Sequence, residues 1–226
     1  ATVIGIDRPR LRNFARRVFE LLTTMVVEGE ENVPPEGGCI LATNHLSRLD
    51  TPFIFIIINR DNLSALVTDK YRFNPLFSLF VNVSDSIWIN REIADFSAIR
   101  AGLQIINRGG MLGIAPEGTR SKSGKLIEAK NGVALLAEKA RVPILPVGLY
   151  GTETAMQEIR ALKKPTLHAR FGKPFTLPPV ERGNHGDSLD KNTEEIMSQI
   201  AALLPDKYHG FYAGNPRIRE LQENQG

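Results

Sequence analysis

Short apolar segments alternate along most of the chain with segments of helical periodicity. The apolar segments predict buried strands at 39–43, 65–68, 87–89, 111–115, 144–150 and 167–171. Between them, apolar residues that recur every three or four positions predict helices at 51–59, 75–80, 95–107 and 131–140. This order of elements is typical of an α/β domain with a mainly parallel central sheet flanked by helices.

The carboxyl-terminal region is expected to contain one more helix. Residues 181–190 are polar and include two glycines, which indicates a loop. Asn192 and Glu195 have the spacing of a capping box, and apolar residues follow at helical spacing up to Leu204. We therefore predict that this helix begins near residue 192.

The amino-terminal segment 8–27 has an amphipathic, basic pattern. Six of its apolar residues recur at helical spacing, namely Leu11, Phe14, Ala15, Val18, Leu22 and Met25. Five arginines crowd its first half: Arg8, Arg10, Arg12, Arg16 and Arg17. Such a helix can lie in a membrane interface, where arginines meet anionic headgroups. It can equally pack its apolar face on the domain core, as surface helices do. We predict an amphipathic membrane-interface helix in residues 1–29 and a separate domain in residues 30–226.

The composition narrows the class of protein. Of 226 residues, 42% are hydrophobic and 23% are charged, which is typical of a globular chain. The single cysteine, Cys39, excludes an internal disulfide framework, and the four histidines are too scattered for a recognisable metal cluster. A net charge of +3 does not indicate nucleic-acid binding. The longest wholly apolar run, 53–58, is far shorter than the ~20 residues of a spanning helix. Without an evident signal peptide, we expect a cytoplasmic setting.

The most informative segment is 44–50, directly after a predicted strand. His45 and Asp50 are five residues apart, so on one continuous helix they would lie on different faces. They can meet only if His45 lies in the strand-to-helix turn and Asp50 caps the helix that Pro52 helps to begin. An imidazole held by a carboxylate can accept a proton from a hydroxyl through its other nitrogen. The alternative is a hydrogen-bonded turn histidine beside a helix cap.

Three further segments follow this pair in a recognisable order. They read Ile-Trp-Ile-Asn-Arg-Glu at 87–92, Ala-Pro-Glu-Gly-Thr-Arg-Ser at 115–121 and Val-Pro-Ile-Leu-Pro-Val at 142–147. Together with 44–50 they resemble the four sequence blocks of the glycerolipid acyltransferase family, the lysophosphatidic acid acyltransferases. The resemblance covers about residues 30–175 and implies that residues 30–226 form an acyltransferase domain.

The resemblance implies an enzyme of phospholipid biosynthesis. Such an enzyme moves a fatty acyl group from acyl-CoA or acyl carrier protein to the free hydroxyl of lysophosphatidic acid, which gives phosphatidic acid. The expected partners are a lysophospholipid, the acyl donor and the membrane surface, with attachment at the cytoplasmic face as a peripheral or monotopic protein. No cofactor or metal is expected, because a thioester is already activated, and no nucleic acid is expected.

Roles for individual residues come from the same resemblance. His45 would be the general base and Asp50 its orienting partner. The acceptor site would be lined by Arg91, Glu117, Gly118, Thr119 and Arg120. Arg120 would bind the phosphate, because the planar guanidinium donates two parallel hydrogen bonds. Glu117 has a structural alternative, in which it pairs with an arginine of the site.

Other functions stay open at this stage. Ala115 and Asn90 depart from the family's pattern, so the acceptor can be a different lysolipid or glycerol 3-phosphate. The basic amphipathic helix is also compatible with an inactive membrane-surface binding protein, and His45 with a hydrolase that activates water. Ser47 is disfavoured as a nucleophile because no Gly-x-Ser-x-Gly elbow surrounds it.

Overall fold

The computed structural model describes residues 7–74, 78–79, 81–82, 84, 86–89, 96–181 and 183–224. Its centre is a seven-stranded sheet with the strand order β1-β7-β6-β2-β5-β3-β4. The strands are β1 (Thr24–Glu28), β2 (Cys39–Thr43), β3 (Leu63–Thr68), β4 (Ile87–Ile89), β5 (Met111–Ile114), β6 (Ile144–Tyr150) and β7 (Thr166–Phe171). All neighbouring pairs are parallel except β6 and β7. The predicted α/β fold with a mainly parallel sheet is confirmed.

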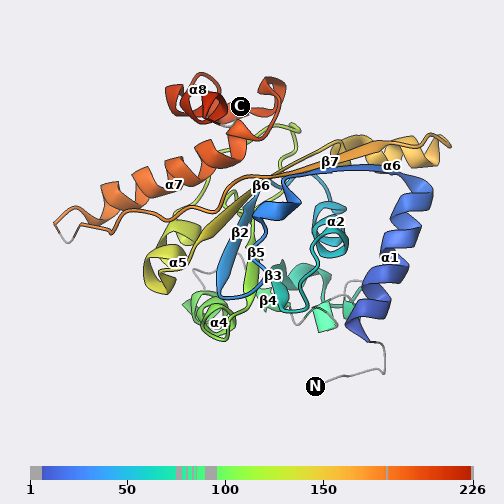
Figure 1. Ribbon diagram of the computed structural model, residues 1–226, viewed down its shortest axis with the longest axis horizontal. Helices are drawn as coiled ribbons and strands as arrows, with labels where there is room; N and C mark the ends of the chain where they lie inside the picture. Colours follow the sequence, from blue (N-terminus) through green and yellow to red (C-terminus); the bar gives the residue numbers. More distant parts are fainter. Residues whose placement is uncertain are drawn as a thin grey trace.

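Helices cover both faces of the sheet (Figure 1). The described helices are α1 (Arg8–Leu22), α2 (Asp50–Ile57), α4 (Phe96–Asn107), α5 (Gly132–Ala140), α6 (Thr152–Arg160), α7 (His185–Ala202) and α8 (Pro216–Glu223). Short 3-10 helices are η1 (Glu30–Asn32), η2 (Asp69–Tyr71), η3 (Asp206–Tyr208) and η4 (Gly210–Tyr212). No helix within the described residues combines the length and the apolar character needed to cross a bilayer.

The sheet separates two hydrophobic clusters. Successive residues of β2 alternate between them: Ile40 and Ala42 pack with α5 and α7, whereas Cys39 and Leu41 pack with α2. This alternation follows from the period of two in a strand. Because both faces are covered, β2 is apolar without interruption, which is why its bounds are predictable from the sequence.

The predicted helix at 8–27 is too long. Helix α1 ends at Leu22, and Thr23 is extended. The next residues form β1, whose first backbone N–H, at Thr24, donates to the Pro165 carbonyl and whose strand pairs in parallel with β7. Pairing with a distant strand outweighs the local helical spacing here. Residues 24–28 thus join the sheet, while the membrane contact of residues 1–29 stays a prediction.

Helix α7 begins at His185 and so includes part of the predicted loop. The predicted capping box is wrong, because Asn192 lies inside the helix. Its side chain is buried and donates to the carbonyl of Pro178, so it ties α7 to the preceding segment. The predicted helix at 75–80 falls largely outside the described residues. Helices α6 and α8 were not predicted.

Candidate active site

Three strand ends meet at one edge of the sheet. Strand β2 lies between β6 and β5 in the strand order and is parallel to both. The carboxyl ends of the three strands are therefore neighbours, as in other open α/β sheets with ligand sites at this edge. The chain leaves β2 through His45, leaves β5 through the loop 115–121, and leaves β6 through Gly151 and Thr152.

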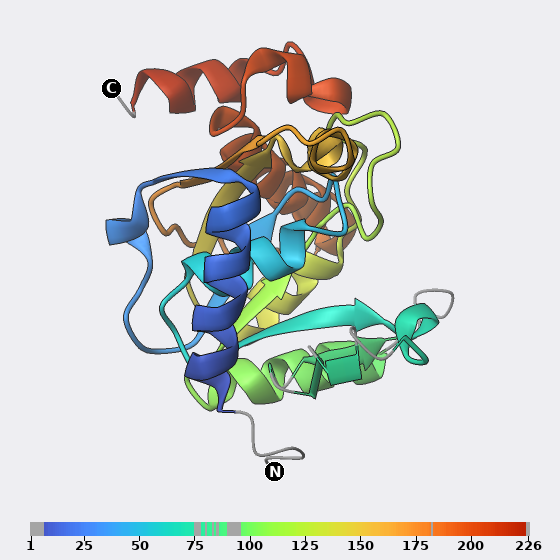
Figure 2. The same cartoon turned by 90° about the vertical axis from the view of Figure 1, so that its right-hand side faces the viewer.

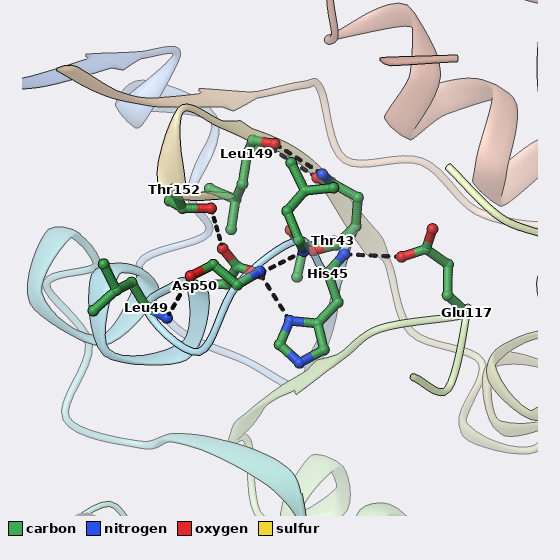
Figure 3. A network of polar contacts seen from close by, with 10 residues as sticks. Thr43, His45, Leu49, Asp50, Glu117, Leu149 and Thr152 are labelled. Atoms are coloured by element: carbon green, nitrogen blue, oxygen red, sulfur yellow. Dashed lines mark hydrogen bonds and ion pairs between the residues drawn. The ribbon is translucent and has the colours of Figure 1, made fainter. Parts of the chain in front are cut away.

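His45 and Asp50 meet in the turn between β2 and α2 (Figure 3). The Nδ1 atom of His45 lies 2.8 Å from Oδ2 of Asp50, and His45 lies in the strand-to-helix turn that such a contact requires. Asp50 differs from the prediction in one respect, because it is the first residue of α2 rather than its cap. Its carboxylate instead holds the turn that precedes the helix.

Asp50 is surrounded by hydrogen-bond donors. Its Oδ2 also accepts from the backbone N–H groups of Leu46 and Ser47, both at 2.7 Å, and its Oδ1 accepts from the Thr152 hydroxyl at 2.5 Å. The residue is 2% exposed. A carboxylate can only accept, so Nδ1 of His45 carries the hydrogen and Nε2 keeps a free lone pair. Figure 3 shows this second ring nitrogen pointing away from Asp50 and Glu117.

The backbone of His45 is held by the loop that follows β5. Its N–H donates to Oε2 of Glu117 at 2.9 Å, and its carbonyl accepts from the N–H of Ser121 at 2.9 Å. The other oxygen of Glu117 accepts from the N–H of Ile127 at 2.9 Å. Glu117 is 1% exposed, so the described residues leave its carboxylate no surface for a substrate.

Glu117 has a structural place in the described part of the protein. It does not line the cavity beside His45, although Gly118, Thr119 and Arg120 do. Its partners among the described residues are the backbone N–H groups of His45 and Ile127, and a pairing with Arg91 stays a prediction because that residue lies outside them. The structure places Glu117 between His45 and Ile127, where it positions the histidine backbone.

Replacing Glu117 with glutamine is expected to change how stability depends on pH. Burial raises the pKa of Glu117 from 4.5 to about 7, against the lowering effect of the two N–H donors. Between these values the folded protein holds a proton that the unfolded chain has released. The contribution of Glu117 to the free energy of unfolding is therefore fully present below about pH 4.5. It is lost as the pH rises to about 7, and the loss amounts to roughly 3 kcal/mol.

Urea unfolding at several pH values measures this effect. The wild type should lose stability across this range, and the Glu117→Gln variant should not show that component. The variant also lacks one acceptor for a buried N–H, which lowers its stability at every pH by about 1–3 kcal/mol. Parallel pH curves for the two proteins would contradict the assignment.

A cavity of about 1020 Å³ opens beside His45. Its cationic lining residues in the described ranges are Arg48, Lys70, Arg120, Lys122 and Lys130, and its acidic one is Asp50. Its apolar lining comes mainly from β2, α2, β3 and β5, namely Leu41, Ile54, Phe55, Leu63, Leu66, Val67 and Ile114. The cavity thus offers a base, a positive field and an apolar wall, which suits an amphiphilic anion.

The predicted residue Arg91 lies outside the described residues, so its place relative to this cavity stays a prediction. The other predicted residues come together as expected, apart from Glu117. His45, Asp50, Gly118, Thr119 and Arg120 all line the cavity. Gly118 has a φ of +66°, a conformation that favours glycine in the turn after β5.

Sequence reasoning missed two supporting residues. The buried side chain of Asn44 donates to the Leu149 carbonyl and accepts from the Leu149 N–H, both at 2.8 Å, and so extends the β2–β6 pairing by one rung. Thr152 supports Asp50 from 102 residues away. The position of Asn44 directly before His45 could have indicated its supporting role from the sequence. No feature of the sequence around Thr152 could have done so.

The carboxyl-terminal tail after Leu204 supports the loop after β5. Leu126 donates its N–H to the Tyr208 carbonyl at 2.8 Å and accepts from the Phe211 N–H at 3.0 Å. The Tyr212 hydroxyl accepts from the Ala129 N–H at 3.0 Å. The tail therefore holds the segment whose Ile127 N–H binds Glu117.

Comparison with known proteins agrees with this architecture. A family model described as Acyltransferase matches residues 24–150, which is more than half of the chain. The chain therefore belongs to the acyltransferase family, and the resemblance seen in the sequence is confirmed at that level.

Several relatives are named as 1-acyl-sn-glycerol-3-phosphate acyltransferases. One from Borreliella burgdorferi is 31% identical over 130 residues, covering 57% of this chain and 52% of its own. One from Bacillus subtilis is 21% identical over 198 residues, covering 84% and 97%. The chain spans about half the length of the first relatives that it matches.

A solved structure supports the fold. The crystal structure of the 1-acyl-sn-glycerophosphate acyltransferase PlsC from Thermotoga maritima matches with a TM-score of 0.64 at 24% identity. The match covers 84% of this chain and 76% of that one. The α/β architecture is therefore shared between the two proteins.

Proposed function

We propose that the protein is an O-acyltransferase that moves a fatty acyl group from acyl-CoA or acyl carrier protein to the free hydroxyl of lysophosphatidic acid. The product is phosphatidic acid. The observation that carries this proposal is the free Nε2 of His45, a residue that lines a cavity with both cationic and apolar lining residues. The names of the relatives support the same reaction.

The proposed reaction is a direct transfer. Nε2 of His45 takes the proton of the acceptor hydroxyl while the hydroxyl oxygen attacks the thioester carbonyl carbon. The resulting tetrahedral adduct expels the thiolate, which recovers the proton from the imidazolium. One ester bond forms and one thioester bond breaks, and the carboxylate of Asp50 stabilises the transient positive charge.

The cavity lining supports an acceptor with a phosphate and an acyl chain. Arg120 can donate two parallel hydrogen bonds to a phosphate, and Lys122 and Lys130 add positive charge. Leu66 and Val67 of β3 and Ile114 of β5, which are only partly buried, provide apolar surface for the acyl chain. The proposal needs no cofactor or metal, because the thioester supplies the activated acyl group.

We also propose that α1 contacts the cytoplasmic face of a membrane. One side of the helix packs on the protein, where Phe19 stacks on Phe53 of α2 at 6.2 Å between ring centroids. Its other side exposes Phe14 and Leu21 by 66% and 76%, together with Arg10 and Arg17. The apolar residues of α1 thus extend beyond the side that packs on the protein, and the exposed ones suit a membrane interface.

Product identification tests the proposed reaction. The protein is incubated with one acyl-CoA and a mixture of lysophosphatidic acid, a monoacylglycerol, another lysolipid and glycerol 3-phosphate, and the products are identified by mass spectrometry. We expect phosphatidic acid as the main product. Because the monoacylglycerol lacks the phosphate, its acylation should be much slower.

The Arg120→Gln variant is the matched control for acceptor recognition. It should lose activity toward lysophosphatidic acid and keep the low activity toward the monoacylglycerol. If the main product comes from a different acceptor, the proposed acceptor is wrong and the protein is still an O-acyltransferase. Free fatty acid as the main product would instead identify a hydrolase.

A further inference from the structure

The turn between α6 and β7 presents an exposed leucine in an uncommon conformation. Leu162 is 96% exposed and has a φ of +57°, in the left-handed region where glycine is usual. Its side chain therefore adds little to the stability of the folded chain, while its backbone conformation is strained. A side chain with these properties is available to a partner outside the protein.

The leucine is flanked by basic residues. Arg160 precedes it, Lys163 and Lys164 follow it, and all three side chains are exposed. None of the three has an ion pair within the described part of the chain. The turn thus combines one apolar tip with three uncompensated positive charges.

This turn lies beside the end of α1. The N–H of Thr24, directly after α1, donates to the Pro165 carbonyl at 2.8 Å, and Thr24 pairs with Thr166 in the β1–β7 register. In Figure 1 the end of α6 and helix α1 lie at the same edge of the molecule, and in Figure 2 both face the viewer. Leu21 and Leu162, two of the most exposed leucines in the described residues, therefore belong to segments that this contact brings next to each other.

We propose that the turn 160–164, here called the basic turn, is a second contact with an anionic lipid surface. Leu162 enters the acyl-chain boundary, and Arg160, Lys163 and Lys164 meet the headgroup phosphates. Charge complementarity favours this partner, because anionic lipids attract clustered Lys and Arg side chains. A single apolar tip on a convex turn also suits a fluid surface, which needs no matching shape.

A contact through the basic turn in addition to α1 would fix the orientation of the protein on the membrane. A helix that lies alone in the interface leaves the protein free to roll about the helix axis. A second contact on α6 removes this freedom and fixes which side of the sheet faces the membrane. This orienting effect rests on the proposed membrane contact of α1, whereas lipid binding by the basic turn does not.

Vesicle co-sedimentation of the intact chain tests the proposal. Vesicles contain phosphatidylcholine with or without phosphatidylglycerol. Leu162→Gly should weaken binding to the anionic vesicles by about tenfold, the effect of losing one buried leucine. Because glycine suits the positive φ, this variant should keep or gain thermal stability, so weaker binding cannot result from misfolding.

A charge variant and a matched control complete the design. Replacing both Lys163 and Lys164 with glutamine should also weaken binding, by about 30-fold, and only when phosphatidylglycerol is present. Phe211→Ala removes a side chain that is 62% exposed on η4, a segment that bonds to Leu126, and should bind like the wild type.

Three outcomes would overturn the proposal. Wild-type affinity in both variants would exclude the basic turn, and a wild type that binds neither kind of vesicle would exclude lipid contact. A dimer that forms without vesicles and is lost in Leu162→Gly would identify a second copy of the chain as the partner. Acyl transfer to a short-chain acceptor that is dispersed as monomers separates lipid binding by the basic turn from the proposed reaction. The rate of this transfer should be unchanged in Leu162→Gly. If the wild type binds vesicles but does not catalyse the transfer, only the proposed reaction is refuted.

Discussion

Replacing His45 with alanine is expected to lower the rate of acyl transfer by about 10²–10⁴-fold, the usual contribution of a positioned general base. The variant loses the Nε2 atom that would take the hydroxyl proton. The fold should survive, because the hydrogen bonds to Glu117 and Ser121 involve the backbone of residue 45 and do not need the ring. Thiol release from acyl-CoA in the presence of lysophosphatidic acid measures the rate.

A histidine outside the site provides the control. The His185 side chain, at the start of α7, is 53% exposed, and His185→Ala should keep wild-type activity. Acceptor binding by His45→Ala should also persist, because the cationic lining is unchanged. Wild-type turnover by His45→Ala would exclude its role as base, and ping-pong kinetics would indicate a covalent intermediate in place of direct transfer.

The predictable part of the site is the part that is local in sequence. His45 and Asp50 belong to one turn, and the strand end before them and Pro52 after them indicated the arrangement in which the two side chains could meet. Strands such as β2 and β6 were predictable because both of their faces are covered, which makes them continuous apolar runs.

The unpredicted part depends on distant partners. Residues 24–28 continue the helical spacing of α1, and only the edge of β7 makes them a strand. Glu117 lies among polar loop residues like a substrate ligand, yet both its oxygens bind backbone N–H groups. Thr152 has no feature that separates it from other threonines until β6 brings it to Asp50.

The apolar stripe of α1 illustrates a different limit. The sequence offered a choice between packing on the core and contact with a membrane. In the structure Phe19 packs on α2, while Phe14 and Leu21 on the other side of the helix stay exposed, so the apolar residues of α1 have two environments. Periodicity reports which residues share a helical face and not what lies against that face.

Replacing Asp50 with asparagine is expected to lower acyl transfer by about 10–10²-fold while the protein stays folded. Among the described residues, Oδ2 of Asp50 faces three donors and Oδ1 faces one, the Thr152 hydroxyl, which can also accept. The amide oxygen of asparagine should therefore take the place of Oδ2, and its NH₂ group should donate to Thr152. His45 keeps the hydrogen on Nδ1, and the loss of rate reflects the missing negative charge, since a hydrogen bond to a charged group contributes about 1.5–3 kcal/mol.

Nitrogen-15 chemical shifts of the His45 ring separate this expectation from its alternative. If the NH₂ group faced the imidazole instead, Nδ1 would have to accept, Nε2 would carry the hydrogen, and the loss should approach the ~10⁴-fold seen for a wrong tautomer in serine proteases. Thr152→Val is the matched control, because it removes one donor from Oδ1 and keeps the carboxylate charge; its effect should stay within about tenfold. Full activity in Asp50→Asn would show that the carboxylate charge takes no part in the reaction, and that His45 needs its partner only for orientation.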